Sequence, residues 1–515
     1  MTSENRETAR GAGAMMTAMD LDADACYRAF QTRDARFDGR CFSGVLSTGI
    51  YCRPVCPART PKRENMVFFP SAAAAQEAGF RPCLRCRPET SPDLGAWHGT
   101  SNTVARALGL IEEGALDGGD VEGLAERLGI GDRQLRRLFQ QHLGASPIAV
   151  AQTRRVLLAK QLLHETRLTM SEVALASGFG SVRRFNETFQ QLFARPPAAL
   201  RRLGAAPRST RDGVVVRLTY RPPYDWESLL AFLAARAIPR VEIVEGHRYA
   251  RTIECDGAQG TITVVPDVKH RLRATVRFPN LRALPAIIAR MRRLFDLAAD
   301  PLAIGAHLST DPMLAAFVAE RSGLRVPGAW DGFELAIRAI LGQQITVSAA
   351  TKLSGRLAGL VGEPLLHPSP DEPALDRLFP TPEAVAASDL AMLGMPRARR
   401  DTLRALANAL VDDRTLLSPG KSLEDAIARL RAVRGIGEWT AQYIAMRQLR
   451  EPDAFPAADV GLLRSATAAG LNDATPASLV ARAEAWRPWR AYAAVHLWAS
   501  SHLEPMEKTH DRHVA

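Results

Sequence analysis

The sequence contains no long apolar run. None of its hydrophobic stretches approaches the ~20 consecutive residues that a membrane-spanning helix needs. Its first residues include acidic side chains and lack the apolar core of an export signal. Cysteine is scarce, at 7 residues in 515. A disulfide framework is typical of short secreted chains and is the less favoured alternative here, so we expect a cytoplasmic protein in a reducing compartment.

Acidic residues are outnumbered by basic ones. The chain has 66 Lys and Arg against 55 Asp and Glu, for a formal net charge of +11. Basic residues cluster at 133–137 and 397–400. A solvated basic face would explain any one cluster, but several clusters beside separate motifs favour a polyanionic partner, with nucleic acid as the leading candidate. The length and the 46% hydrophobic content predict about three or four domains.

Four of the cysteines follow the pattern C-x3-C…C-x2-C. They are Cys52, Cys56, Cys83 and Cys86. Each close pair can place two thiolates on one cation, and two pairs complete a tetrahedral shell with Zn–S bonds of about 2.3 Å. The remaining Cys26, Cys41 and Cys255 have no close partner. The spacing therefore predicts a single Zn²⁺ bound by four cysteines.

Residues 99–204 contain an internal duplication of helix, tight turn and helix. In the first copy, Val121–Leu128 has the apolar spacing of a helix, Gly129 ends it, and Asp132 can cap the helix that follows. In the second copy, Ser181 is a natural N-cap for the second helix.

Both second helices carry Arg and Gln on their polar faces, as a recognition helix in a major groove requires. The arginines are Arg133, Arg136, Arg183 and Arg184. A plain helical bundle remains the alternative for one copy taken alone. Two copies joined by one linker helix, over about residues 147–165, favour DNA binding.

This duplicated stretch resembles the AraC-type regulator module, including its Gly178-Phe-Gly180 turn and its closing Phe193-Ala-Arg-Pro-Pro197. The segment before it resembles the methylphosphotriester-repair domain of Ada, which is joined to the same module in that family. The residues that carry this second resemblance are Thr48-Gly-Ile-Tyr-Cys52-Arg-Pro-Val-Cys56, Arg63-Glu-Asn65 and Gly79-Phe-Arg-Pro-Cys83-Leu-Arg-Cys86.

The Ada resemblance implies a reactive zinc site. A zinc-bound thiolate remains a soft nucleophile, and by position Cys52 is the methyl acceptor while the other three cysteines hold the metal. Thr48, Arg81 and Arg85 match positions that approach the DNA backbone. The reaction would consume the protein and reduce the negative charge of the cluster by one unit, so repair would also raise DNA affinity. Composition alone favours the alternative of a purely structural zinc site.

The C-terminal half begins with a strand, helix, strands, helix pattern over residues 213–298, which predicts a small α+β domain. Amphipathic helices follow. Among them, helical segments flank Gly435-Ile-Gly437. Such glycines let the backbone turn sharply and leave free N–H groups for a phosphate, a grip without sequence preference. An ordinary helix cap and short loop would give the same letters.

Asp459 lies twenty residues beyond Trp439, and helix-hairpin-helix DNA glycosylases have an aspartate at about this distance. The resemblance extends to DNA-3-methyladenine glycosylase II (AlkA). Its other segments here are Arg221–Trp226, Arg338–Gln343, Leu393–Pro396 and Trp486–Tyr492.

The AlkA resemblance implies base flipping and cleavage of the N-glycosidic bond. Asp459 would stabilise positive charge on the sugar and orient the attacking water. The aromatic side chains that would stack on the electron-poor base are Trp439, Tyr443 and Trp498, with Phe232 near the pocket. Bifunctional relatives place a Schiff-base lysine where this chain has Trp439, so β-lyase activity is not expected.

Two assignments remain open between neighbours. By the resemblance, the family's wedge residue, which fills the space of the flipped base and is an apolar Leu in the best-known relative, aligns with Gln344, next to Ile345. Asp453 is the main rival to Asp459 as the catalytic carboxylate, though the superfamily pattern favours Asp459.

We therefore expect a multidomain α+β protein that resembles bacterial Ada–AlkA fusions. The expected parts are a disordered tail (1–20), an α/β zinc methyl-acceptor domain (21–92), an all-α double helix-turn-helix domain (99–204), a small α+β domain (213–298) and an all-α helix-hairpin-helix glycosylase domain (299–508). No Pro-Cys-His-Arg motif occurs, so O6-methylguanine methyltransferase activity should be absent.

The resemblance implies a monofunctional 3-methyladenine glycosylase that is also a stoichiometric methylphosphotriester methyltransferase and a transcriptional activator. Its expected partners are alkylated and promoter DNA and RNA polymerase, and we expect a monomer. One alternative is an alkylation-responsive transcription factor with an inactive glycosylase half. Another is a structural zinc protein that bends or compacts DNA.

Overall fold

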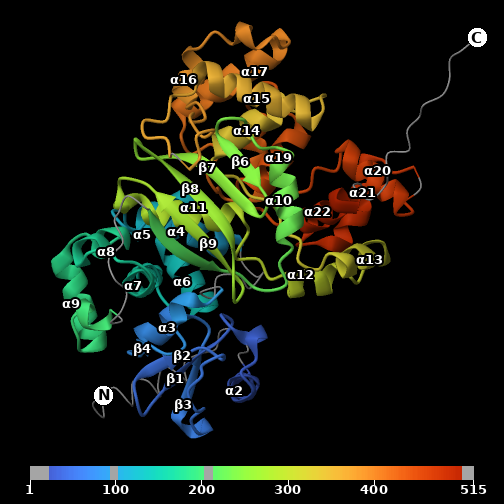
Figure 1. The fold of residues 1–515 in the computed structure, drawn as a ribbon. Helices are drawn as coiled ribbons and strands as arrows, with labels where there is room; N and C mark the ends of the chain where they lie inside the picture. Colours follow the sequence, from blue (N-terminus) through green and yellow to red (C-terminus); the bar gives the residue numbers. More distant parts are fainter. Residues whose placement is uncertain (1–21, 93–101, 202–212, 370, 472, 501–515) are drawn as a thin grey trace, which may run out of the picture.

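The computed structural model describes residues 22–92, 102–201, 213–369, 371–471 and 473–500 (Figure 1). The expected tail, residues 1–20, lies outside the described residues. In Figure 1 the Cys-rich region lies at the bottom, the duplicated helical region above it and to the left, a twisted sheet in the middle, and the C-terminal helices above the sheet and to its right. No described helix is long and apolar enough to cross a membrane.

The Cys-rich region is built on a four-stranded sheet of order β3-β1-β2-β4. Its strands are β1 (Phe42–Val45), β2 (Ile50–Cys52), β3 (Met66–Phe69) and β4 (Arg81–Pro82), and its helices are α2 (Ala23–Thr32) and α3 (Ala72–Glu77). Strand β1 pairs antiparallel with β2 and β3, while β2 and β4 are parallel. The parallel pairing brings the end of β2 beside the end of β4, where the two halves of the cysteine motif lie.

The duplicated region contains six helices among its described residues. They are α4 (Asn102–Glu112), α5 (Val121–Arg127), α6 (Asp132–Leu143), α7 (Pro147–Glu165), α8 (Met170–Ala176) and α9 (Val182–Phe193). The linker helix expected at 147–165 is confirmed as α7, and Ser181 caps α9 as expected. The cap expected at Asp132 was wrong. Gly131 occupies that position, and Asp132 is already the first helical residue.

The central sheet has five antiparallel strands in the order β5-β9-β8-β7-β6. The strands are β5 (Val214–Thr219), β6 (Glu242–Glu245), β7 (Arg248–Cys255), β8 (Ala258–Asp267) and β9 (Arg271–Arg277), with α10 (Trp226–Ala234) and α11 (Leu284–Leu294). This confirms the small α+β unit. Alternation along β5, buried at Val214, Val216 and Leu218, is typical of a strand with one face in a core.

The second helix-turn-helix and the central sheet share one hydrophobic core. Phe185 and Phe189 of α9 are fully buried in the same cluster as Val216 of β5 and Ile287 of α11. Apolar area buried between two elements stabilises both at roughly 25 cal/mol per Å². These two parts therefore pack against each other and are not independent domains joined by a linker.

The C-terminal region is helical, as expected. Its helices are α12 (Pro301–Leu308), α13 (Pro312–Glu320), α14 (Gly332–Leu341), α15 (Val347–Val361), α16 (Pro382–Ala387), α17 (Arg397–Asp412), α18 (Leu423–Arg431), α19 (Glu438–Arg447), α20 (Val460–Ala468), α21 (Pro476–Ala483) and α22 (Arg490–Ser500). They surround one large core that includes Ile337, Leu406, Ile444 and Trp486.

Buried ion pairs connect the two halves of the chain. Arg106 of α4 binds Glu451 at 2.7 Å, with both side chains less than a tenth exposed. Arg221 binds Asp300 at 3.2 Å and also the backbone carbonyl of Asp38 in the Cys-rich region at 3.2 Å. Since an unpaired buried charge is strongly unfavourable, these pairs select one arrangement of the regions.

Candidate functional site

Asp459 is the N-cap of α20, so its side chain sits at the start of that helix. Its Oδ1 accepts the backbone N–H of Leu462 at 3.0 Å and the indole N–H of Trp498 at 2.9 Å. Its Oδ2 accepts the indole N–H of Trp439 at 2.9 Å. Three N–H donors hold one partly exposed carboxylate, and such a fixed negative charge can stabilise a developing cation.

The aromatic side chains selected from the sequence come together beside this carboxylate. The rings of Trp439 and Tyr443 stack with centroids 5.3 Å apart and an interplanar angle of 13°. Tyr443 meets Trp498 edge-on at 6.3 Å. These separations are typical of packed aromatic pairs, and the three rings form one wall next to Asp459. Helices α19 and α22 supply them.

Two arginines complete this wall and were missed from the sequence. Arg447 donates to the Tyr443 hydroxyl at 2.6 Å, and its guanidinium lies 4.9 Å from the Phe232 ring. Arg236 lies 3.7 Å over the same ring. Burial by itself would raise the pKa of Tyr443, but the positive charges of Arg447 and Arg236 outweigh it and lower that pKa. Phe232 is thus joined to the aromatic wall through arginine, and Arg236 reaches its ring from the turn after α10.

The Gly-x-Gly turn lies between α18 and α19. Gly435 has φ +89°, and a Cβ there would lie 1.9 Å from the Thr402 hydroxyl, so only glycine fits. Gly437 is the exposed N-cap residue of α19 and makes no side-chain cap. Backbone N–H groups at this helix start remain open for an anion, as the motif predicts.

The two wedge candidates lie in the turn between α14 and α15. Gln344 is exposed and has φ +59°, a left-handed conformation that costs free energy for a residue with a Cβ. Ile345 is half-buried. The neighbouring Gln343 anchors the turn to the hairpin, because its amide donates to the Gly435 carbonyl at 3.3 Å and to the Thr440 hydroxyl at 3.1 Å.

Asp453, the rival carboxylate, is bound to arginine side chains. It accepts two hydrogen bonds from Arg490, at 2.7 and 3.0 Å, and it also pairs with Arg487. A carboxylate held by two guanidiniums is a structural tie between α22 and the loop before α20. The geometry therefore favours Asp459.

The four cysteines of the motif form a second site at the other end of the molecule. Their Sγ atoms all lie within 4.8 Å of one another, which fits one Zn²⁺. The backbone N–H of Arg53 points at the sulfur of Cys86 at 3.4 Å, and that of Arg85 at the sulfur of Cys83 at 3.3 Å. Donors aimed at sulfur suit metal-bound thiolates, so the donor set fits the cofactor.

The three side chains expected at the DNA backbone differ in exposure. Thr48 and Arg85 are exposed, and Arg81 is half-buried. All four cysteines are buried, and none is more than 9% exposed. Cys26 and Cys41, which have no close partner in the sequence, are buried in the same hydrophobic cluster as the four motif cysteines.

The arginines expected on the recognition helices are exposed. Arg133 and Arg136 lie on α6, and Arg183 and Arg184 on α9, with the apolar sides of both helices buried. Arg136 pairs loosely with Asp132 at 3.5 Å, and Arg183 with Glu187 at 2.8 Å. Exposed pairs of this kind are weak, so phosphates can replace the carboxylates.

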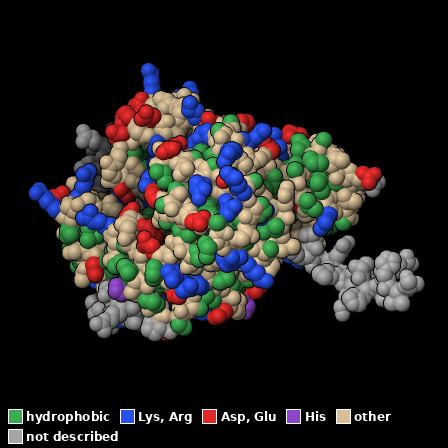
Figure 2. Space-filling model, turned by 90° about the horizontal axis from the view of Figure 1, so that it is seen from above, with side chains coloured by type: hydrophobic (Ala, Val, Ile, Leu, Met, Phe, Trp, Pro, Cys, Tyr) green, Lys and Arg blue, Asp and Glu red, His purple; other side chains and the backbone are tan. Residues whose placement is uncertain are grey.

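On the face seen in Figure 2, Lys and Arg side chains gather across the middle with acidic side chains between them.

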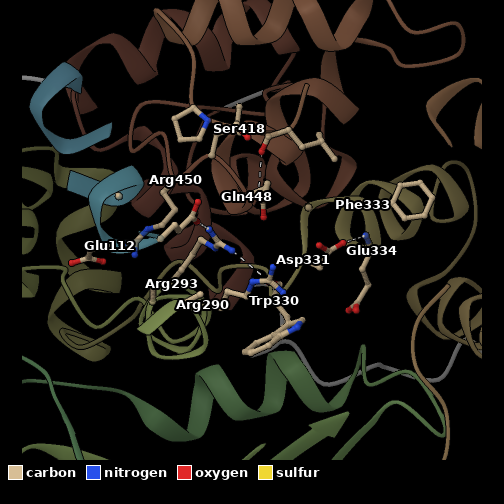
Figure 3. A pocket seen from close by; sticks show the side chains of 18 of the residues that line it. Glu112, Arg290, Arg293, Trp330, Asp331, Phe333, Glu334, Ser418, Gln448 and Arg450 are labelled. Carbon is tan, nitrogen blue, oxygen red and sulfur yellow. Dashed lines mark hydrogen bonds and ion pairs between the residues drawn. The ribbon is translucent and has the colours of Figure 1, made fainter. Parts of the chain in front are cut away.

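A sizeable cavity of the described structure lies away from Asp459. It has a volume of about 730 Å³ and lies where α4, α11 and the C-terminal helices meet (Figure 3). Its charges are mostly neutralised in place, for example by the pairing of Arg293 with Glu113 and of Arg450 with Asp296. Trp330, between Arg251 and Arg290, is itself buried. We interpret it as space left between docked regions.

Family models match four successive parts of the chain. They are the metal binding domain of Ada (residues 25–89), a helix-turn-helix domain (124–203), the AlkA N-terminal domain (215–331) and the HhH-GPD superfamily base excision DNA repair protein (337–491). A 3-methyladenine DNA glycosylase from Archaeoglobus fulgidus superposes with a TM-score of 0.50 over 56% of this chain and 99% of its own, at 21% identity, and thus shares the fold.

Two relatives cover the chain to different extents. DNA-3-methyladenine glycosylase 2 of Escherichia coli is 38% identical over 56% of this chain and 99% of its own. The probable bifunctional transcriptional activator/DNA repair enzyme AlkA of Mycobacterium tuberculosis is 42% identical over 94% of this chain and 97% of its own. The chain therefore belongs to the family of AlkA-type bifunctional transcriptional activator/DNA repair enzymes.

Proposed function

We propose that this protein excises alkylated bases such as 3-methyladenine from double-stranded DNA and also regulates transcription in response to DNA methylation. The observation that carries the repair activity is the Asp459 carboxylate, fixed by Trp439 and Trp498 at 2.9 Å each beside an aromatic wall. A flipped, positively charged purine suits stacking on that wall. The fixed carboxylate stabilises positive charge on the sugar as the glycosidic bond breaks, and it orients the attacking water.

Release of free 3-methyladenine from dimethyl-sulfate-treated DNA tests this activity. The wild type should release the base and Asp459→Asn should not, with unchanged DNA binding. Asp371→Asn is a matched control, because Asp371 is an exposed carboxylate that pairs with Arg277 at 3.2 Å, on the sheet. Equal release by Asp459→Asn and the wild type would contradict the role of Asp459, and no release by either protein would leave a regulator whose C-terminal half only holds DNA.

The second proposed activity is methyl transfer from DNA methylphosphotriesters to Cys52. Zinc bound by Cys52, Cys56, Cys83 and Cys86 keeps the sulfurs deprotonated, and Thr48, Arg81 and Arg85 supply contacts to the backbone next to the lesion. The sulfur of Cys52 forms the new bond to carbon and the phosphate oxygen leaves. The thioether has no ready leaving route, so each chain accepts one methyl group.

Intact-mass measurement tests the transfer. Zinc-loaded protein incubated with DNA that carries methylphosphotriesters should gain one methyl group per chain, located on Cys52 by peptide mapping, and Cys52→Ser should gain none. Methyl groups on another cysteine would contradict the assignment. Cys255 is the internal control, since it is buried at the end of β7 and away from the cluster.

The regulatory role gives the expected partners. Two helix-turn-helix motifs in one chain read two successive groove segments, so we propose that a monomer binds promoter DNA in the cytoplasm and recruits RNA polymerase. We propose the functional units 21–92, 99–204, 213–298 and 299–508 for these activities, with Gly435, Gly437 and the turn at Gln344 and Ile345 on the damaged duplex.

A further inference from the structure

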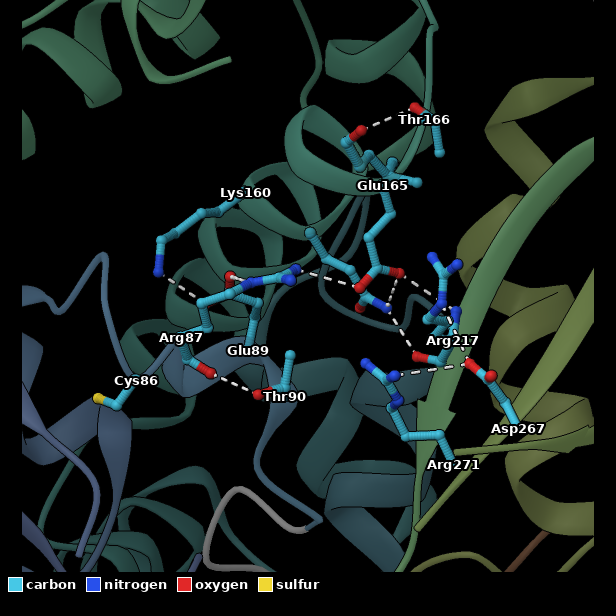
Figure 4. Close-up of polar contacts among 12 residues, drawn as sticks. Cys86, Arg87, Glu89, Thr90, Lys160, Glu165, Thr166, Arg217, Asp267 and Arg271 are labelled. Carbon is cyan, nitrogen blue, oxygen red and sulfur yellow. Dashed lines mark hydrogen bonds and ion pairs between the residues drawn. The ribbon is translucent and has the colours of Figure 1, made fainter. Parts of the chain in front are cut away.

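Lys160 of α7 is a fully buried cation at the junction of the Cys-rich region and the helix-turn-helix region. Its ammonium donates to the backbone carbonyl of Cys83 at 2.8 Å and pairs with Glu89 at 2.6 Å. The Lys160 side chain is 0% exposed and that of Glu89 is 1% exposed. Both partners belong to the Cys-rich region, and Cys83 is a residue of the metal-binding motif. Figure 4 shows Lys160 beside Glu89.

Burying the charged Lys160 side chain at this position costs free energy that an apolar side chain would not cost. The lysine lies on a helix whose neighbouring positions, such as Ala159 and Leu162, are fully buried. Taking an ammonium and a carboxylate out of water costs several kcal/mol per ion, and an apolar pair of similar size would often be at least as stable. A buried ion pair here therefore points to a requirement for charge beyond simple docking.

The contact continues across α7 to the central sheet. Arg87, beside the metal-binding motif, pairs with Glu89 at 3.0 Å and with Glu165 at the end of α7 at 3.1 Å. Glu165 in turn accepts the backbone N–H of Arg217 in β5 at 3.2 Å. One chain of polar contacts thus runs from the cysteine motif through the central regulator helix to the sheet (Figure 4).

The charges of this network balance in pairs. Lys160 is matched by Glu89, Arg87 by Glu165, and Arg53 by Asp38, all largely buried. The thiolate cluster is the remaining charge, and the Cys86 thiolate attracts the Lys160 ammonium. Because Coulomb interactions are strong where water is excluded, a change of one charge on the cluster alters the hold of the Cys-rich region on α7.

We propose that Lys160 is the positioning residue through which the helix-turn-helix region senses the charge of the four-cysteine cluster. This deepens the proposed methyl-acceptor function and rests on it. With the full negative charge, the cluster attracts Lys160 and the Cys-rich region is docked firmly on α7. When one thiolate charge is removed, the attraction weakens, the docking loosens, and the two motifs joined by α7 become freer to fit DNA.

Hydrogen exchange of the α7 amides in the zinc-loaded, full-length protein tests this proposal. The cluster charge is reduced in two independent ways: by methylation, with iodomethane or methylphosphotriester DNA, and by Cys52→Ser. Metal analysis confirms one zinc per chain in each sample. In the wild type, either change should lower protection of residues 157–165 by roughly fivefold or more, in the usual range of coupling between two sites.

The variants separate sensing from packing. Lys160→Met should have lower protection at the start and show less than a twofold response to the cluster charge, and Lys160→Gln takes its place if Lys160→Met fails to fold. Lys160→Arg keeps the charge and should restore the response. The ratio of promoter DNA affinity with and without the cluster charge should follow the same pattern, being largest in the wild type and smallest without the lysine.

Each outcome decides between the two proposals. An equal response in Lys160→Met and the wild type overturns the role of Lys160, whatever the source of the charge change. If methylphosphotriester DNA transfers no methyl group but Cys52→Ser still produces a lysine-dependent response, then the acceptor function fails and the sensing role stands. A wild type that shows no response to either charge change also overturns the sensing role.

Discussion

Trp439 donates its indole N–H to the Asp459 carboxylate at 2.9 Å while its ring stacks on Tyr443. The Trp439 side chain thus serves two purposes, of which a phenylalanine could serve only the stacking. It restricts where the carboxylate points, and it offers an electron-rich face to a base. Catalytic power from a fixed charge depends on such prior orientation, since a mobile carboxylate would have to reorganise during the reaction.

We expect Trp439→Phe to lower single-turnover excision by roughly tenfold or more, because a hydrogen bond to a charged group is worth about 1.5–3 kcal/mol. Stacking remains, so DNA affinity should change little. Trp498→Phe removes the donor to the other oxygen and should have a similar effect. A large loss of affinity with a normal excision rate would show that the ring acts in binding only.

Gly461→Ala should reduce excision without destabilising the fold. A Cβ at this position lies 3.0 Å from Asp459 Oδ1 and 3.4 Å from Trp498 Cδ1, so it pushes on the contact that orients the carboxylate. Alanine is otherwise favoured in a helix by up to ~1 kcal/mol. Gly359→Ala in α15 is the matched control, since its nearest atom lies 3.9 Å away. Unchanged kinetics would mean that the oxygen has room to move.

Gly435→Ala should weaken DNA binding and lower the melting temperature. The residue has φ +89°, and its Cβ would overlap the Thr402 hydroxyl. Gly437 has φ −88°, and a Cβ there would have no neighbour within 4 Å. Gly437→Ala should therefore leave the melting temperature unchanged. The loss of affinity in Gly435→Ala should be similar for all sequences, because phosphate contacts carry no sequence information. A sequence-dependent loss would point to contacts with bases.

Removal of zinc should unfold the Cys-rich region first. Its second core, around Phe30 and Phe68, contains all four motif cysteines, and without metal no bond holds these four side chains together. We expect a chelator to release one zinc per chain and to abolish methyl transfer while excision persists. Metal analysis and both activities on the same sample check this. Loss of excision in parallel with zinc would show that the C-terminal half depends on the metal.

The stability of the protein should fall in acid partly through His496. Burial lowers the pKa of this histidine to about 4, and one ring nitrogen has no hydrogen-bond partner. The unfolded chain, with a pKa near 6.5, then binds more protons between those two values. The contribution is present above pH 6.5 and is lost as pH falls towards 4, by about 3 kcal/mol. Denaturation of His496→Asn across this range should show a smaller loss.

The sequence predicted local features well because they leave local signals. The linker helix expected between the two copies agrees with the bounds of α7, and the distance from Trp439 to Asp459 pointed to the candidate active site. The cap at Asp132 was wrong because glycine can hold a helix start without a side-chain acceptor. A lysine on the apolar face of α7 was the one available signal for Lys160.

Contacts between distant segments could not be predicted. Arg106 meets Glu451 across 345 positions, and Lys160 meets Glu89 across 71. The spacing of nearby residues does not indicate either pairing, because many arginines and carboxylates in the chain have similar neighbours in the sequence. Only the folded arrangement selects which charges become buried together.

The core shared by α9 and the central sheet has a consequence for how a cell can use this protein. If the gene were divided between the two, each product would carry a bare hydrophobic face and a tendency to aggregate. The regulatory part and the repair part are therefore always made in equal numbers. Every molecule that occupies a promoter also carries one excision site, so the regulatory response and the repair capacity depend on the same protein molecules.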